Sequence, residues 1–149
     1  MRIQLVYFDF NYLEHSWCWL HDPEIKRLTD SPKITRKGQK EWFINLKKID
    51  DYLVWGVELD STPIGACGLK KITDSDCEYW GYIGEKQYWG KGLGTEMMNL
   101  LEQKARKLGK SAMWLKVIKE NIKAIALYKK QGFITESESE SLIVMRKQL

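Results

Sequence analysis

Residues 87–95 read Gln-Tyr-Trp-Gly-Lys-Gly-Leu-Gly-Thr, with glycine at positions 90, 92 and 94. Residues 78–83 before them are rich in the aromatic residues typical of a strand, and an amphipathic pattern typical of a helix follows. Glycine allows positive φ and a close approach of the backbone to a ligand, and the first turn of a helix presents N–H groups without intrahelical partners. The order strand, glycine loop, helix therefore indicates a site for a phosphate anion.

The spacing of these glycines excludes two common phosphate-binding motifs. A P-loop requires G-x-x-x-x-G-K-[ST], and the dinucleotide fingerprint requires G-x-G-x-x-G with an acidic residue about 20 positions further on. Here the pattern is G-x-G-x-G, and the end of the following helix is basic, with Lys104, Arg106, Lys107 and Lys110. Taken alone, the glycines are explained more simply by a turn that starts a helix.

A second motif changes that balance. Residues 121–133 read N-I-K-A-I-A-L-Y-K-K-Q-G-F, in which Asn121 is a good N-cap and Gly132 suits a helix C-terminus. The patterns Q-x-x-G-x-G-x-G and N-x-x-A-x-x-L-Y-x-x-x-G-F, in this order and separated by one helix and one strand, resemble the GNAT superfamily of acyl-CoA-dependent N-acyltransferases. The match is clear over residues 78–133 and looser elsewhere.

The resemblance implies an α/β (α+β) fold, a GNAT-like mixed and mostly antiparallel sheet flanked by helices, in which the two central parallel strands splay apart. Periodicity alone indicates only mixed α and β structure. It predicts strands over 3–8, 52–59, 64–72, 77–83, 112–118 and 133 onward, and helices over 13–29 (one broken helix or two short ones, with the break at Asp22-Pro23), 35–48, 93–108 and 121–130. Apolar residues share one face of the third of these helices, which we expect in the core: Leu93, Met97, Leu100, Leu101, Ala105 and Leu108.

The resemblance also implies acetyl-CoA as cosubstrate. Its pantetheine arm is expected in the gap between the splayed strands, paired with backbone near Tyr82 and Ile83. Backbone N–H groups of the glycine loop are expected to hold its diphosphate, and the predicted cofactor residues are Gln87, Tyr88, Trp89, Gly90, Lys91, Gly92, Gly94, Thr95 and Asn121. Packing is the simpler role for Trp89, solvent and phosphate are equally good partners for Lys91, and N-capping alone would explain Asn121.

Two residues are predicted to carry the chemistry. Tyr128, at the tyrosine position of the second motif, is the expected general acid for the departing thiolate. Glu78 is the candidate base, although a solvent-facing place on its strand is a slightly favoured alternative. The branch of the family that acetylates ribosomal-protein N-termini has a glutamate where this chain has Lys116, which argues against that activity here.

Composition sets broad limits. A chain of 149 residues is expected to form one domain, residues 1–149, and a net charge of +4 suits an anionic ligand better than nucleic acid. We expect no membrane segment, because no apolar run approaches the ~18–20 residues of a span, and we expect a cytoplasmic protein. Cys18, Cys67 and Cys77 lack metal-ligand spacing, so no metal is expected.

The acceptor is the least constrained part. The N-terminal helices match several branches of the family, and a small amine metabolite such as an amino sugar, aminoglycoside or polyamine is favoured. Acidic residues in this region could attract a cationic amine, although solvation of helix ends explains them more simply: Asp22, Glu24, Asp30 and Glu41. A protein N-terminal acetyltransferase and a non-catalytic acyl-CoA-binding domain are the alternatives, and a homodimer is left open.

Overall fold

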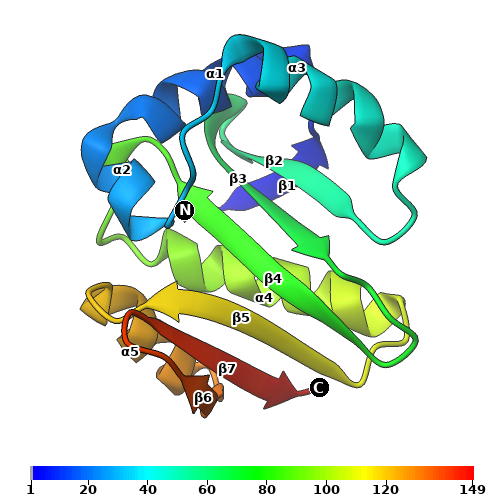
Figure 1. Ribbon diagram of the computed structural model, residues 1–149, viewed down its shortest axis with the longest axis vertical. Coiled ribbons are helices and arrows are strands. Elements are labelled where there is room, and N and C mark those ends of the chain that lie inside the picture. The colour runs from blue at the N-terminus through cyan, green and yellow to red at the C-terminus, as the bar shows by residue number, and fades with distance from the viewer. Residues whose placement is uncertain (1) are drawn as a thin grey trace.

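One seven-stranded sheet organises the computed structural model, which describes residues 2–149. The strand order is β1-β2-β3-β4-β5-β7-β6, and every neighbouring pair is antiparallel except β4 and β5, which are parallel (Figure 1). The strands are β1 (Ile3–Tyr7), β2 (Leu53–Leu59), β3 (Thr62–Lys70), β4 (Asp76–Ile83), β5 (Ala112–Ile118), β6 (Ile134–Glu138) and β7 (Leu142–Gln148). The predicted mixed, mostly antiparallel sheet is confirmed.

Three helices cover one face of the sheet. These are α1 (Phe10–His21), α2 (Pro23–Leu28) and α3 (Arg36–Asn45), the last followed by a 3-10 turn, η1 (Leu46–Lys48). Asp22 separates α1 from α2, because its carboxylate accepts hydrogen bonds from two N–H groups at the start of α2 while Pro23 occupies the first turn. The predicted break in the N-terminal helical segment is therefore confirmed.

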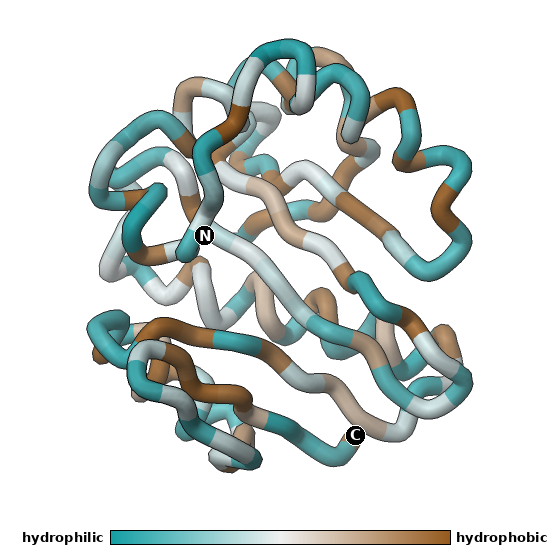
Figure 2. Tube along the Cα trace, in the orientation of Figure 1, coloured by the Kyte–Doolittle hydropathy of each residue, from teal (hydrophilic) through white to brown (hydrophobic). Residues whose placement is uncertain are grey.

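Helices α4 (Leu93–Lys107) and α5 (Ile122–Lys130) lie on the opposite face, behind β4 and β5 in Figure 1. The strands alternate between the two faces: Tyr79 of β4 packs into the core under α4, whereas Trp80 and Tyr82 pack with α1 and α2. Figure 2 shows hydrophobic residues gathered along strands such as β5 and hydrophilic residues in the connections. Both faces of the sheet are thus covered, which fits the buried parallel pair at its centre.

The apolar face of α4 differs from the prediction at its end. Leu108 is 44% exposed, whereas Met98, which the predicted stripe omitted, is completely buried. Leu108 is the C-cap, and Gly109 after it has a φ of 78°, so the chain leaves the helix before Leu108 can turn inward. Apolar residues spaced three and four positions apart share one buried face only within the helix itself.

The central parallel pair separates after three residue pairs. β4 and β5 are paired at Asp76↔Ala112, Cys77↔Met113 and Glu78↔Trp114 and no further. Beyond Glu78, β4 continues beside β3 and β5 continues beside β7, so a gap opens between two strand edges. The predicted splay is confirmed, and Glu78 lies at the point where the strands part.

None of the helices within residues 2–149 combines the length and the apolar character that a bilayer crossing would require.

Candidate active site

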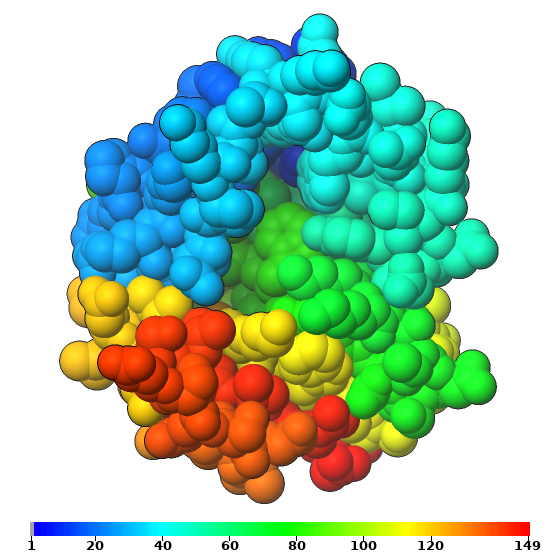
Figure 3. Space-filling model, viewed as in Figure 1, coloured from blue at the N-terminus to red at the C-terminus, as the bar shows by residue number. Residues whose placement is uncertain are grey.

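A cavity of about 1320 Å³ follows the gap between β4 and β5. Its walls come from α2 and the segment after it, from β4 and β5, and from the first turns of α4 and α5. Figure 3 shows the hollow in the surface where the N-terminal helices, β4 and β5 meet. The cavity therefore joins both faces of the sheet through the gap.

The glycine loop ends in a helix start with open donors. Gly90 and Gly92 have φ values of 76° and 79°, which only glycine adopts without strain, and Gly92 is the N-cap of α4. The first intrahelical hydrogen bond runs from Glu96 N–H to Gly92 C=O (3.2 Å), so the N–H groups of residues 93–95 precede the helical ladder. Residues 93–95 all line the cavity. This helix start offers the open donors that an anion of the predicted kind would need.

The predicted loop residues differ in their surroundings. Gly94 allows α5 to approach α4, because a Cβ there would lie 3.3 Å from Leu127 Cδ1. Trp89 lines the cavity and its indole N–H donates to Ile83 C=O (2.8 Å), so it fastens the loop to the end of β4. Gln87 and Lys91 are exposed and do not line the cavity, whereas Tyr88, Gly90 and Thr95 do.

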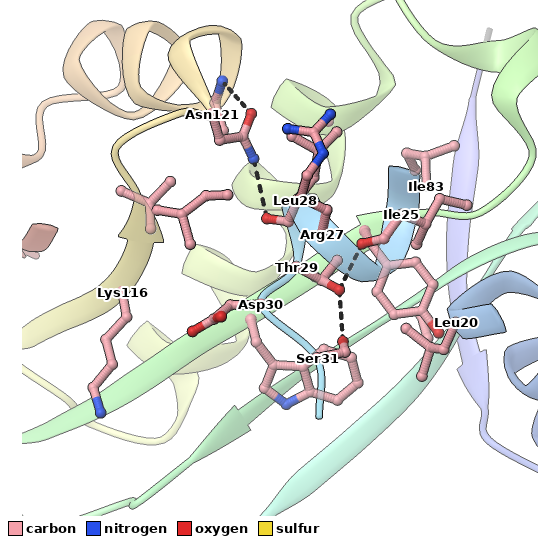
Figure 4. A pocket seen from close by; sticks show the side chains of 18 of the residues that line it. Leu20, Ile25, Arg27, Leu28, Thr29, Asp30, Ser31, Ile83, Lys116 and Asn121 are labelled. Atoms are coloured by element: carbon pink, nitrogen blue, oxygen red, sulfur yellow. Dashed lines mark hydrogen bonds between the residues drawn. The ribbon is translucent and has the colours of Figure 1, made fainter. Parts of the chain in front are cut away.

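The far wall of the gap begins at Asn121. Its side-chain oxygen accepts a hydrogen bond from Ala124 N–H (3.3 Å), which caps α5, and its amide nitrogen donates to Leu28 C=O (3.4 Å) at the end of α2 (Figure 4). Asn121 lines the cavity, as do Tyr82 and Ile83 on the opposite strand. The same residue thus caps a helix and ties α2 over the gap.

Tyr128 reaches the gap from α5, on the face of the sheet that α4 covers. Its ring lies 6.1 Å from the Tyr79 ring and 5.9 Å from the Phe133 ring, measured between centroids. Burial raises the pKa of Tyr128 to about 12, and the Tyr79 hydroxyl acts in the opposite direction. The phenol therefore stays protonated at neutral pH and is available as a proton donor.

Glu78 is buried, which corrects the slightly favoured expectation of a solvent-facing residue. Its relative exposure is 4%, because α2, α3 and the connection after α2 cover that face of the sheet. The Lys71 ammonium lies 3.4 Å from Oε1 and the Lys70 ammonium 4.0 Å from Oε2. Oε1 is buried, and it accepts no hydrogen bond from the described residues although Lys71 lies beside it. Its capacity to accept a hydrogen bond is therefore unused.

Glu78 and Tyr128 lie on opposite sides of the gap. Glu78 and Tyr79 are consecutive in β4, so their side chains point to opposite faces, and Tyr128 packs on Tyr79. A group held in the gap would therefore meet the carboxylate from one face and the phenol from the other. The two predicted catalytic residues are brought to the same point without touching each other.

A row of four aromatic side chains lines the cavity on the Glu78 face, and the sequence did not reveal it. This aromatic wall consists of Trp42, Tyr52, Trp80 and Tyr82, with successive ring centroids 6.3, 6.5 and 6.3 Å apart. Trp80 and Tyr82 follow Glu78 at alternate positions, a signal that the strand pattern contained. Trp42 and Tyr52 come from α3 and the connection to β2, and nothing local in the sequence predicts their place.

The acidic residues of the N-terminal region have partners in the fold. Asp22 and Glu24 both pair with Lys86, at 2.9 and 3.0 Å. The hydrogen bond with Lys86 lowers the pKa of Asp22. Glu24 and Asp30 line the cavity and Glu41 does not. Within residues 2–149, no three His, Cys, Asp or Glu side chains are grouped so that they could hold a metal ion.

Comparison with known proteins assigns the family. The sequence model of the acetyltransferase (GNAT) family matches residues 11–133. The chain is 33% identical to the Uncharacterized N-acetyltransferase YobR of Bacillus subtilis over 79 residues, which is 53% of this chain and 32% of that protein. It spans about a third or less of the length of the curated relatives it matches.

Two solved structures share the whole fold. A domain from Methanocaldococcus jannaschii superimposes with a TM-score of 0.88 at 20% identity, covering 99% of both chains. The spermidine N-acetyltransferase from Vibrio cholerae, solved in complex with CoA and spermine, superimposes with a TM-score of 0.87 at 20% identity, covering 98% of this chain and 95% of that one. Because the family model matches residues 11–133, most of this chain, the chain belongs to the acetyltransferase (GNAT) family.

Proposed function

We propose that the protein transfers the acetyl group of acetyl-CoA directly to a primary amine. The observation that carries this proposal is the gap between β4 and β5, which has open helix N–H groups at one end and Glu78 with Tyr128 at the other. A long coenzyme with a diphosphate at one end and a thioester at the other fits that arrangement. Family membership supports it, and the Vibrio cholerae structure contains CoA.

The coenzyme would be held mainly by backbone. Its diphosphate meets the N–H groups at the start of α4, where each helix-end charge interaction contributes ~0.3–1 kcal/mol, and more where partly buried. Its pantetheine arm runs along the unpaired edge of β4, past Ile83 and Tyr82, where strand backbone offers donors and acceptors. An arm on this path brings its reactive end toward Glu78 and Tyr79.

The chemical step uses one group from each face. An amine of ordinary pKa ~10.4 costs ~4–5 kcal/mol to deprotonate at pH 7, and Glu78 accepts that proton. The amine nitrogen then bonds to the thioester carbon, the carbon–sulfur bond breaks, and the Tyr128 hydroxyl gives its proton to the sulfur. The second nitrogen proton returns through water to Tyr128. The products are an amide, the CoA thiol and one proton that leaves Glu78 for solvent.

The acceptor is a small amine metabolite, and an amino sugar, an aminoglycoside and a polyamine are the classes proposed. Protein N-terminal acetylation is the alternative activity, and Lys116 on β5 argues against it. A non-catalytic acyl-CoA-binding domain is the second alternative, and a proton donor at Tyr128 argues against it. A cytoplasmic location is part of the same proposal.

Calorimetry with acetyl-CoA, followed by a thiol-release assay with a panel of amines, tests the proposal. We expect saturable binding of acetyl-CoA and thiol release that depends on an added amine. Binding without amine-dependent release would favour the non-catalytic alternative. An oligonucleotide that binds where acetyl-CoA does not would contradict the proposal.

A further inference from the structure

Most of the acidic side chains that line the cavity already form ion pairs within the protein. Four acidic residues line the cavity, and three have cationic partners: Glu24 with Lys86, Glu78 with Lys70 and Lys71, and Glu120 with Arg27. Asp30 forms no ion pair with any residue of 2–149. A polycationic acceptor would therefore find few free carboxylates.

Lys116 is the counterpart of Asp30. It lies on β5 beyond the last residue pair with β4, lines the cavity, and has no ion-pair partner in the described part of the chain. Its ammonium lies 5.9 Å from the centroid of the Trp114 ring, and Lys71 lies 5.4 Å from the same ring. Trp114 is the register partner of Glu78, so Lys116 lies one ring away from the carboxylate that Lys70 and Lys71 pair with.

Asp30 is held in place by its neighbours. Its φ is 51°, a left-handed conformation that aspartate tolerates, and Thr29 bonds to both Ile25 C=O (2.7 Å) and the Ser31 hydroxyl (2.6 Å). Figure 4 shows Asp30 and Lys116 extending into the same part of the cavity, from the segment after α2 and from β5. A ligand there would meet a free carboxylate and a free ammonium together.

The aromatic wall closes the same region. Tyr52 and Trp80 both line the cavity, with their ring centroids 6.5 Å apart. Trp80 comes two residues after Glu78 in β4. Flat apolar surface favours a ligand whose body has an apolar face, such as a sugar ring or an aromatic ring. It gives no counter-charge for an anion. Three lysines of the cavity lining form no ion pair with the residues of 2–149, namely Lys33, Lys116 and Lys123, and of these Lys116 lies beside the ring of Trp114, the register partner of Glu78.

Resting on the proposed acetyl transfer, we infer that the acceptor is a ring-bearing amine that also carries an anionic group, with Lys116 binding that anion while Glu78 receives the amine. The juxtaposition of a partly open buried carboxylate, an unpaired lysine and an aromatic wall selects this class over polyamines and aminoglycosides. The amine needs a proton acceptor, the anion needs a cation, and the ring needs apolar contact. The cavity supplies one group for each.

Matched pairs of amines test the inference. Glucosamine 6-phosphate with glucosamine, and tyrosine with tyramine, differ within each pair only by the anionic group, and spermine represents the polycations. In at least one pair, we expect the member with the anionic group to have a kcat/KM roughly tenfold or more above the member without it, since only the former can form a charge-assisted hydrogen bond with Lys116. The pair that shows the preference tells a sugar ring from an aromatic ring.

Substitutions at Lys116 connect the preference to the residue. Lys116→Gln should abolish the difference within the preferred pair, mostly through KM, and Lys116→Glu should make spermine the better acceptor. Lys107→Glu, on the exposed side of α4, changes the net charge by as much as Lys116→Glu does and should leave the preference unchanged. Acetyl-CoA affinity, measured by calorimetry, should stay the same in all three variants.

Three outcomes would overturn the inference. One is a wild-type protein that acetylates spermine more efficiently than either anionic amine, and another is a preference that survives Lys116→Gln. The third is an absence of turnover with all five amines. Thiol release with another amine of the panel separates that result from a failure of the proposed function, because acetyl transfer then takes place and only the inferred acceptor class is wrong.

Discussion

The coenzyme side and the acceptor side of the cavity are built from different parts of the chain. On the coenzyme side, the groups that would bind are backbone N–H groups after Gly92 and the free edges of β4 and β5. On the acceptor side they are side chains: Glu78, Lys116, Asp30 and the aromatic wall. Backbone geometry can thus accept the coenzyme, while side chains determine which acceptor fits.

Tyr128 lies where the coenzyme side meets the acceptor side, and its loss should have the largest effect. Tyr128→Phe keeps the packing against Tyr79 and Phe133 but removes the proton donor. We expect kcat to fall by ~10²–10⁴ with the acetyl-CoA dissociation constant nearly unchanged. Steady-state kinetics and calorimetry measure the two quantities. Tyr7→Phe, on exposed β1, is the control, and full activity in Tyr128→Phe would refute the acid role.

The acceptor side should also be sensitive to alkali. Burial raises the pKa of Tyr52, a member of the aromatic wall, to about 12. The folded protein holds the Tyr52 proton more tightly than the unfolded chain does. The contribution of the protonated side chain to the free energy of unfolding is therefore complete below pH ~10 and is lost as the pH rises to about 12. The expected loss is about 1.4 kcal/mol per pH unit in that window.

Urea denaturation at pH 9, 10 and 11 measures that loss. In Tyr52→Phe, the free energy of unfolding should fall less steeply above pH 10 than in the wild type. Equal slopes in the two proteins would show that Tyr52 is ionised as easily in the fold as in water.

The coenzyme side can be tested by a change of backbone rather than of charge. Gly92→Val forces a branched residue to a φ of 79° at the helix start, so the donors of residues 93–95 should move. We expect the acetyl-CoA dissociation constant to rise at least ~tenfold. Gly109→Val imposes a similar strain at the other end of α4, at a φ of 78°, and should destabilise the fold without changing affinity. Equal affinities in a folded Gly92→Val protein and the wild type would contradict the assignment.

Asn121 should show the smallest effect, because it connects the two sides through structure. Asn121→Ala removes the cap of α5 and the bond to Leu28, and should lower the free energy of unfolding by ~0.5–2 kcal/mol. Asn121→Asp keeps the capping oxygen and should recover most of that loss. If Asn121→Asp restores stability but not coenzyme affinity, the amide itself contacts the coenzyme.

The sequence predicted the glycine loop and the start of α5 because their signals are local. Glycine at positions 90 and 92 and the cap at Asn121 reflect backbone requirements within a few residues of each position. The mixed, mostly antiparallel sheet and the splay of its central parallel strands came from the family resemblance, since periodicity does not specify which strands pair.

The acceptor side was largely hidden because its residues meet only in the folded chain. Trp42, Tyr52 and Lys116 come from three separate segments, and each has an ordinary place in its own local pattern. The burial of Glu78 depends on the N-terminal helices that cover it, which alternation within β4 could not reveal. Leu108 was misplaced for the opposite reason, because a helical pattern was extended one residue past the end of its helix.

A crystal structure of the protein with coenzyme A bound would test the central proposal most directly. We expect the diphosphate on the N–H groups of residues 93–95 and the pantetheine arm between β4 and β5, with its sulfur near Glu78 and Tyr128. Coenzyme bound elsewhere, or strands that stay separated with no arm between them at saturating coenzyme, would contradict it.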